Sequence, residues 1–275
     1  MDDETLVGLV EEHLPADEAQ WLLSQRRPAV SIEHSPAADV RSRLGGSALL
    51  PPGTAWPTWN DKPLSLVALL DLAELAGMDT GLDLPTVGLL NVFFEADEQM
   101  AWGFDPAHAD GSRLILADPS DAVTVEPPPG AVHFATFPVA GRQYGSIPSL
   151  DEERLPNQAI DSTQEYTWEF QEALDEAGPH HQVGGWPRYV QGPFWLECQL
   201  VSNGFYLGDG TYPLGAAELG EQRILAQEWE LLLQLDCDFV AGQEWGDMGR
   251  LYFVMRKADL AEGRFDRSWM VLQCS

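Results

Sequence analysis

The sequence predicts a β-rich α+β protein with an internal duplication, in which two similar antiparallel β units pack around a pseudo-twofold axis. Four blocks, a glycine pair followed by three apolar segments of strand length, occur in the first half of the chain and recur in the same order in the second half. Amphipathic segments at the N-terminus and in the acidic middle are typical of helices. The predicted single domain divides into an N-terminal helical arm (1–40), a first β repeat (41–118), an acidic linker with a helix (119–179) and a second β repeat (180–275).

The N-terminal arm is predicted to contain helices followed by a strand. Apolar residues recur at helical spacing over residues 6–14, behind two aspartates that suit the positive end of a helix. Pro15 interrupts this pattern, and Pro28 ends the second helical segment. Alternation of apolar and polar residues over 30–34 then predicts a short strand.

The repeat is supported by matching residues as well as by block order. The strand candidates are 64–72, 88–94 and 112–117 in the first copy, and 229–236, 249–255 and 269–273 in the second. The glycine pair 45–46 corresponds to the pair 184–185, where a tight turn or a close backbone approach is expected. Asp71 corresponds to Asp236. Chance similarity between hydrophobic strands is the alternative, but the flanking glycines and aspartates favour duplication, and the cleft between two such units is a natural place for a ligand.

The acidic linker is predicted to hold an edge strand at 132–137 and a helix that Asp161 caps. Tyr166, Phe170 and Leu174 form an apolar stripe on this helix. A second stripe consists of Glu165, Glu169, Glu172 and Glu176, with no lysine or arginine in 161–177. Like charges at this spacing destabilise a helix slightly, and a basic partner would relieve the repulsion. In so acidic a chain, coincidence is the alternative explanation.

The charge of the chain excludes several classes of partner. Fifteen Lys and Arg oppose 44 Asp and Glu among 275 residues, which gives a formal net charge of -29. Such a chain is repelled by nucleic-acid phosphates and by anionic lipid, so neither nucleic acid nor membrane is expected as a partner. The acidic N-terminus and the lack of an apolar run of about 18 residues predict a cytoplasmic protein. The three cysteines include no C-x-x-C pair and are expected to be small apolar side chains.

The most acidic loop after a predicted strand is the best candidate for a metal site. Asp236, Asp238 and Asp247 supply carboxylates of the kind that bind calcium or magnesium. The spacing is not that of an EF-hand, and aspartate is also a common turn residue. Trp186 and Trp245, with Asp247, are candidate ligand or partner contacts near turns, although such aromatics also close the ends of a small core. No catalytic motif occurs, and no cofactor is expected.

The block W-G-D-x-G-R-L-Y-F at 245–253, with the entry stretch SRLGGSALLPPGTAWP at 42–57, resembles the YwqG-like family of uncharacterised bacterial proteins. The resemblance covers roughly 42–274, and the long acidic helical middle departs from the family pattern. It implies a duplicated β-rich α+β fold, no firmly attached enzymatic activity, and a suspected role in immunity against toxins.

We therefore expect a non-enzymatic protein-binding module, an immunity-type protein that neutralises a basic toxin or effector. The alternative is a small-ligand or divalent-cation-binding protein, or an enzyme, with its site in the cleft between the repeats near 236–247.

Overall fold

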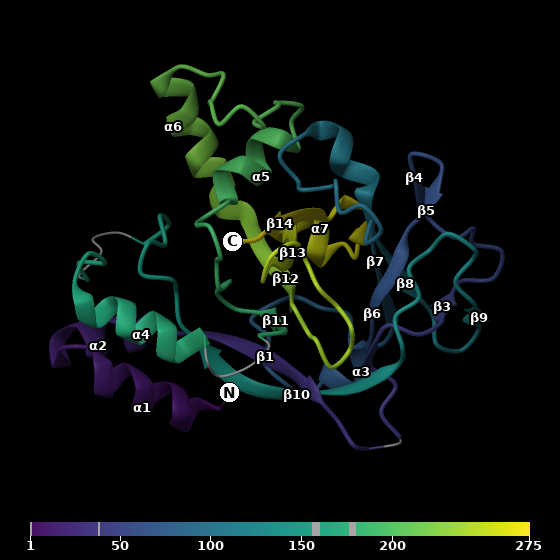
Figure 1. Ribbon diagram of the computed structural model, residues 1–275, viewed down its shortest axis with the longest axis horizontal. Coiled ribbons are helices and arrows are strands. Elements are labelled where there is room, and N and C mark those ends of the chain that lie inside the picture. The colour runs from purple at the N-terminus through teal and green to yellow at the C-terminus, as the bar shows by residue number, and fades with distance from the viewer. Residues whose placement is uncertain (1, 38, 156–159, 176–179) are drawn as a thin grey trace.

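The computed structural model describes residues 2–37, 39–155, 160–175 and 180–275 (Figure 1). It is a mixed helix and strand structure dominated by one ten-stranded antiparallel sheet, with the strand order β14-β13-β12-β11-β1-β10-β2-β6-β7-β8. The sheet curls until it is nearly barrel-shaped. Two small two-stranded sheets, β3-β9 and β4-β5, accompany it.

The strands of the large sheet are β1 (Arg27–His34), β2 (Arg43–Leu44), β6 (Ser65–Asp71), β7 (Leu89–Phe94), β8 (Ser112–Ala117), β10 (Phe137–Ser146), β11 (Gln182–Gly184), β12 (Trp229–Asp236), β13 (Arg250–Arg256) and β14 (Trp269–Gln273). The small sheets contain β3 (Ala48–Leu50), β4 (Thr58–Trp59), β5 (Lys62–Pro63) and β9 (Val123–Val125). The α-helices are α1 (Asp3–His13), α2 (Ala16–Ser24), α3 (Leu72–Leu75), α4 (Glu165–Asp175), α5 (Trp195–Val201), α6 (Ala216–Leu225) and α7 (Lys257–Ala261). Three 3₁₀ helices are η1 (Pro106–Gly111), η2 (Ala226–Glu228) and η3 (Phe265–Arg267).

The two predicted β units are not separate bodies, because β1 and β10 join them edge to edge. On one side of this central pair the order is β2-β6-β7-β8, and on the other it is β11-β12-β13-β14. The registers match as well: the β6–β7 pairing shifts between Leu66 and Ala68, and the β12–β13 pairing shifts between Leu231 and Leu233. The predicted packing of two units against each other is therefore replaced by one continuous sheet.

Strand β10 corrects the prediction of a short edge strand at 132–137. Its residues 139–146 pair with the whole of β1, from Arg27 opposite Ser146 to His34 opposite Val139, in the middle of the sheet. Glycines and polar residues in this segment hide its strand character. The structure requires one of these glycines, because a Cβ at Gly141 would lie 2.7 Å from Val30 Cγ1.

Both predicted glycine pairs adopt the conformation that favours glycine. Gly45 and Gly46 have φ values of 61° and 81°, and Gly184 and Gly185 have values of 71° and 72°. A Cβ on Gly184 would lie 2.0 Å from the carbonyl oxygen of Thr80, so the chain passes too close for a side chain. The expected close backbone approach is confirmed at both pairs.

The main core draws on both halves of the sheet. Val67 and Leu90 from the first half pack in one cluster with Leu233 and Phe253 from the second. A second cluster lies under α5, and a third is formed by α1, α2 and α4, which gather at one end of the molecule (Figure 1). Burial of these apolar faces is the main stabilising contribution.

The N-terminal helices form as predicted, and Pro15 separates them. Asp2 Oδ1 accepts a hydrogen bond of 2.9 Å from the Thr5 amide and caps α1. The predicted apolar stripe of α4 is confirmed, since Phe170 and Leu174 are buried in the helical cluster. Asp161 instead closes a turn with Thr163 before α4 begins. Among the described helices, none has the length and apolar character needed to cross a bilayer.

Candidate ligand-binding pocket

A pocket of about 680 Å³ opens between the helical end of the molecule and the sheet. Leu6 on α1, with Phe170 and Leu174 on α4, lines one wall, and Ile32 on β1 lies in another. Most of the other lining residues come from β10 and the segment that follows it, from 180–181 and 187–192, and from the end of β12, the loop after it and the start of β13. No lining residue belongs to 41–118. The pocket therefore differs from the predicted cleft between the repeats, because core side chains fill the space between the two halves.

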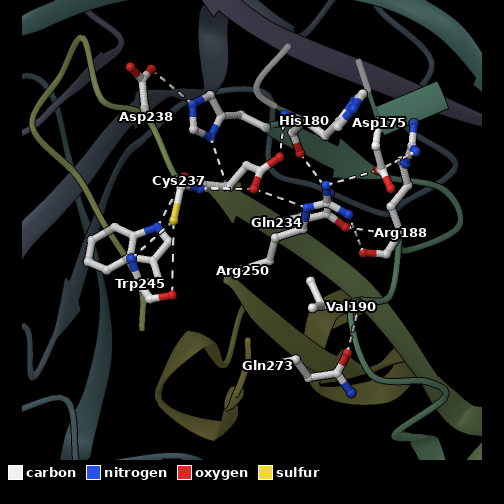
Figure 2. A network of polar contacts seen from close by, with 12 residues as sticks. Asp175, His180, Arg188, Val190, Gln234, Cys237, Asp238, Trp245, Arg250 and Gln273 are labelled. Carbon is white, nitrogen blue, oxygen red and sulfur yellow. Dashed lines mark hydrogen bonds and ion pairs between the residues drawn. The ribbon is translucent and has the colours of Figure 1, made fainter. Parts of the chain in front are cut away.

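Two arginines and two aspartates form the polar floor of this pocket, and Figure 2 labels three of them, Arg188, Arg250 and Asp175. The Arg188 and Arg250 side chains are only 19% and 10% exposed. Asp175 Oδ1 lies 2.8 Å from Arg188 Nη2 and 3.3 Å from Arg250 Nη2, so one carboxylate oxygen bridges both guanidinium groups. Asp236 Oδ1 lies 3.0 Å from Arg250 Nε. The floor is therefore a compact ion cluster of balanced charge.

The sheet register positions Arg250, and a buried amide positions Arg188. Arg250 begins β13 directly opposite Asp236 at the end of β12, which brings the cross-strand ion pair together. Gln234 on β12 is fully buried, and its Oε1 accepts a 2.9 Å hydrogen bond from the Arg188 amide. Gln234 Nε2 donates to the His180 carbonyl at 2.6 Å. One side chain thereby fixes both loops that border the pocket.

The surroundings shift the pKa values of the floor residues in different directions. Burial, followed by the charge of Arg250, lowers the pKa of Arg188. Burial also opposes the charge of Arg250, but Asp236 and other nearby groups outweigh it and raise the pKa of Arg250. Burial and the two arginines lower the pKa of His180 to about 2, so its imidazole is neutral at physiological pH. His180 Nε2 is buried and has no hydrogen-bond partner among the described residues.

A second polar cluster lies behind the floor and is centred on Asp238. Asp238 Oδ2 is 2.6 Å from His34 Nε2 and 3.2 Å from His181 Nε2, and its side chain is 1% exposed. His181 Nδ1 accepts a 3.0 Å hydrogen bond from the Asp236 amide, which leaves Nε2 as the donor to Asp238. The two clusters are therefore joined through His181 and Asp236.

The three carboxylates predicted as metal ligands have separate environments. Asp236 faces Arg250 on the pocket floor, Asp238 faces the histidines behind it, and Asp247 is exposed at the far end of the loop between β12 and β13. In the part of the chain that the structure describes, no group of three or more His, Cys, Asp or Glu side chains is arranged to hold a metal ion.

The predicted ligand and partner contacts are not among the floor residues of the pocket. Trp186 is 2% exposed and lies under the Arg27 guanidinium, 3.5 Å from its ring centroid, and Trp245 is fully buried. Neither tryptophan lines the pocket. Glu165, Glu169 and Glu172 are exposed along α4, as the stripe predicts, and Glu176 lies outside the described residues.

Sequence reasoning missed Arg188 and Arg250 as pocket residues. The signal available for Arg250 was a charged residue at the start of an apolar strand, one of only 15 Lys and Arg in the chain. Burying a charge is costly unless it is paired, so such a position marks either an ion pair or a site. Arg188 follows a proline in a loop, and no local pattern distinguishes it.

The curled antiparallel sheet and the helices beside it define an α+β domain with a polar-floored pocket that opens between them. Residues 42–274 match the model of the DUF1963 family, described as a domain of unknown function, and the chain belongs to this family. The matched range contains every strand of the large sheet except β1. A comparison with curated proteins gave no significant match.

Proposed function

We propose that this chain is a small-molecule-binding protein whose ligand occupies the pocket over Arg188 and Arg250. The main support for this proposal is that two of the few basic side chains of the chain are mostly buried on the floor of a cavity of about 680 Å³. This volume is within the range of about 300–1,000 Å³ that is typical of ligand pockets. Burying charged groups costs free energy, and a binding role accounts for that cost.

The rim of the pocket also supports this function. Phe239 and Met248 border the pocket and are 61% and 57% exposed. Together with the apolar wall of α1 and α4, they give a ligand apolar surface to cover above a polar floor. A ligand with an apolar body and one polar end fits this arrangement.

A substitution that narrows the pocket tests the proposal. Gln171 is exposed on α4 and lines the pocket, so Gln171→Trp places a bulky ring at its entrance without disturbing the core. In a ligand-observed NMR screen of neutral, anionic and cationic fragments, we expect hits on the native chain whose affinity decreases about tenfold or more in Gln171→Trp, a loss of about 1.4 kcal/mol.

Glu172→Trp is the matched control, because Glu172 is exposed on the same helix but does not line the pocket. This variant should retain the hits. A screen with no hits, or hits that bind equally to Gln171→Trp, would exclude this pocket as the site.

A second candidate function is binding of a basic protein by α4, in the immunity-type role that the YwqG-like resemblance implies. Trp168 is 67% exposed on α4 beside Glu165, Glu169 and Glu172. An exposed tryptophan among carboxylates combines an aromatic anchor with charge that complements lysine and arginine. This combination supports the proposal more strongly than acidity alone.

Affinity capture followed by measurement of the dissociation constant tests this second function. We expect a basic protein bound by the native chain to lose about 30-fold in affinity for Trp168→Ala, since anchoring aromatics commonly contribute about 2 kcal/mol. Ile224→Ala, which removes another exposed apolar side chain on α6, should bind normally. Equal binding by all three chains would place the interface elsewhere.

We also propose that the two halves of the sheet descend from one duplicated unit, of the YwqG-like type. The mirrored strand order, the equivalent register shifts and the paired glycines support this origin. Asp71 and Asp236 end equivalent strands, but Asp71 pairs with Leu89 in the ladder whereas Asp236 pairs with Arg250. This difference supports the idea that the second copy diverged to form a binding site.

A further inference from the structure

We infer that the ligand of the pocket carries a carboxylate, and that this carboxylate takes the place of the Asp175 side chain between Arg188 and Arg250. The inference rests on the proposed small-molecule-binding function and specifies the chemical class of the ligand. Asp175 then acts as an internal substitute that holds the two guanidinium groups when the ligand is absent.

The exposure of the bridging carboxylate differs from that of the groups it bridges. The Asp175 side chain is 59% exposed, whereas Arg188 and Arg250 are 19% and 10% exposed. Among the described residues, the side-chain hydrogen bonds of Asp175 are the two with these arginines. Because the Asp175 side chain is exposed and, in the part of the chain that the structure describes, has only these two hydrogen bonds, it can rotate toward solvent without loss of other contacts. The guanidinium groups of the two arginines are more deeply buried, so they cannot move into solvent as easily.

Asp236 is the permanent counter-ion of the cluster, and Asp175 is the replaceable one. Asp236 is 7% exposed, and it accepts 2.9 Å hydrogen bonds from the amides of His180 and Cys237 in addition to its ion pair with Arg250. Those backbone contacts fix Asp236 to the sheet. Asp175 has only the two guanidinium contacts to lose, and a ligand can restore both of them.

The charge balance of the floor selects a carboxylate over other groups. Two guanidinium groups face two carboxylates, so a ligand carboxylate that replaces Asp175 leaves the buried charge unchanged. A neutral ligand would leave one guanidinium charge unpaired in a mostly buried site, which is costly. A doubly charged phosphate would add excess negative charge beside Asp236. The planar carboxylate also matches the fork of guanidinium donors.

The wall beside Asp175 indicates what the carboxylate is attached to. Phe170 and Leu174 on the same helix, and Leu6 on α1, line the pocket next to the ion cluster. An apolar or aromatic group joined to the carboxylate would contact these side chains while its charged end reaches the arginines. Phenylacetate is the simplest probe with this chemistry.

Titration of the full chain with phenylacetate, followed by NMR, tests the inference. Asp175→Asn removes the competing charge, so we expect phenylacetate to bind this variant roughly 3- to 10-fold more tightly than the native chain, because its carboxylate no longer has to displace one that is already bound. Phenylacetamide, a neutral analogue, should gain nothing from the substitution. Glu172→Asn is the matched control on the same helix and should leave phenylacetate binding unchanged.

The outcomes separate this inference from the proposed function. If phenylacetate binds equally to the native chain and to Asp175→Asn, or to neither, or if inorganic phosphate binds Asp175→Asn more tightly than phenylacetate does, the carboxylate assignment is wrong. Fragment binding that Gln171→Trp blocks would still establish the pocket as a site in those cases. Asp175→Asn leaves one mostly buried guanidinium without its carboxylate, so we expect a lower thermal unfolding temperature that phenylacetate raises again, and a single cooperative transition verifies folding.

Discussion

Replacing Asp238 with alanine is expected to lower the free energy of unfolding by about 3–5 kcal/mol at neutral pH, because it removes a buried carboxylate that accepts four hydrogen bonds and leaves the donors without a partner. Asp238 accepts hydrogen bonds from His34 and His181 and from the amides of Val240 and Ala241. Its removal leaves the His181 Nε2 donor buried without a partner. Urea unfolding of the two proteins measures the difference.

Asp238→Asn should also destabilise the chain, although asparagine has nearly the same shape. The tautomer of His181 is fixed, because its Nδ1 accepts from the Asp236 amide and its Nε2 must donate. In Asp238→Asn, the side-chain oxygen can still accept from the amides of Val240 and Ala241. The side-chain NH₂ group then faces His181 Nε2, which is itself a donor, so this hydrogen bond is lost. Asp247→Asn, an exposed change of the same type in the same loop, is the control and should stay within about 0.5 kcal/mol.

The contribution of Asp238 should decrease in acid. Burial acts to raise the pKa of Asp238, but the hydrogen bonds from His181 and the Ala241 amide outweigh it and hold the pKa well below the ordinary value of 3.8. A carboxylate with a lowered pKa stabilises the fold above its unfolded-state pKa, and this stabilisation is lost as the pH falls toward the folded-state pKa. The difference between the native chain and Asp238→Asn should therefore be full at about pH 5 and decline below about pH 4. If the difference in unfolding free energy between the two proteins does not change over this pH interval, the lowered pKa of Asp238 would be contradicted.

The local elements of this fold are readable from the sequence, whereas the arrangement of the sheet is not. Continuous apolar blocks correctly predict β6, β7, β12 and β13, because these strands are covered on both faces. β10 escapes this reasoning, since its centre carries glycine and polar residues. Its place beside β1 depends on pairing between segments about a hundred residues apart, and local patterns carry no information about such pairings.

The candidate site was predictable only where the sheet register determines it. Asp236 ends one strand of a hairpin and Arg250 begins the next, so antiparallel pairing alone places them opposite each other. Arg188 comes from a loop and Asp175 from the end of a helix, and both reach Arg250 through tertiary packing. The acidic loop drew attention to Asp236, but its partner is a guanidinium rather than two further carboxylates.

Trp245→Ala is expected to lower the free energy of unfolding by about 3–5 kcal/mol, the usual cost of truncating a buried aromatic side chain. The ring is fully buried and meets Phe94 of β7 and Phe134 edge to face, with centroid distances of 5.8 and 5.9 Å. Its Nε1 donates to the Asp236 carbonyl at 3.0 Å. Trp245 therefore links the loop after β12 to a strand of the first half, and its loss opens a cavity between them.

Trp168→Ala is the matched control, because it makes the same substitution at a 67% exposed position and should change stability by no more than about 0.5 kcal/mol. Equal losses for the two variants would contradict a core role for Trp245. Trp245→Phe keeps an aromatic ring but removes the donor to the Asp236 carbonyl, so we expect an intermediate loss of about 1–2 kcal/mol with phenylacetate binding preserved. If Trp245→Phe kept full stability but lost phenylacetate binding, Trp245 would act on the ligand through Asp236 and Arg250, and its burial in the core would be secondary.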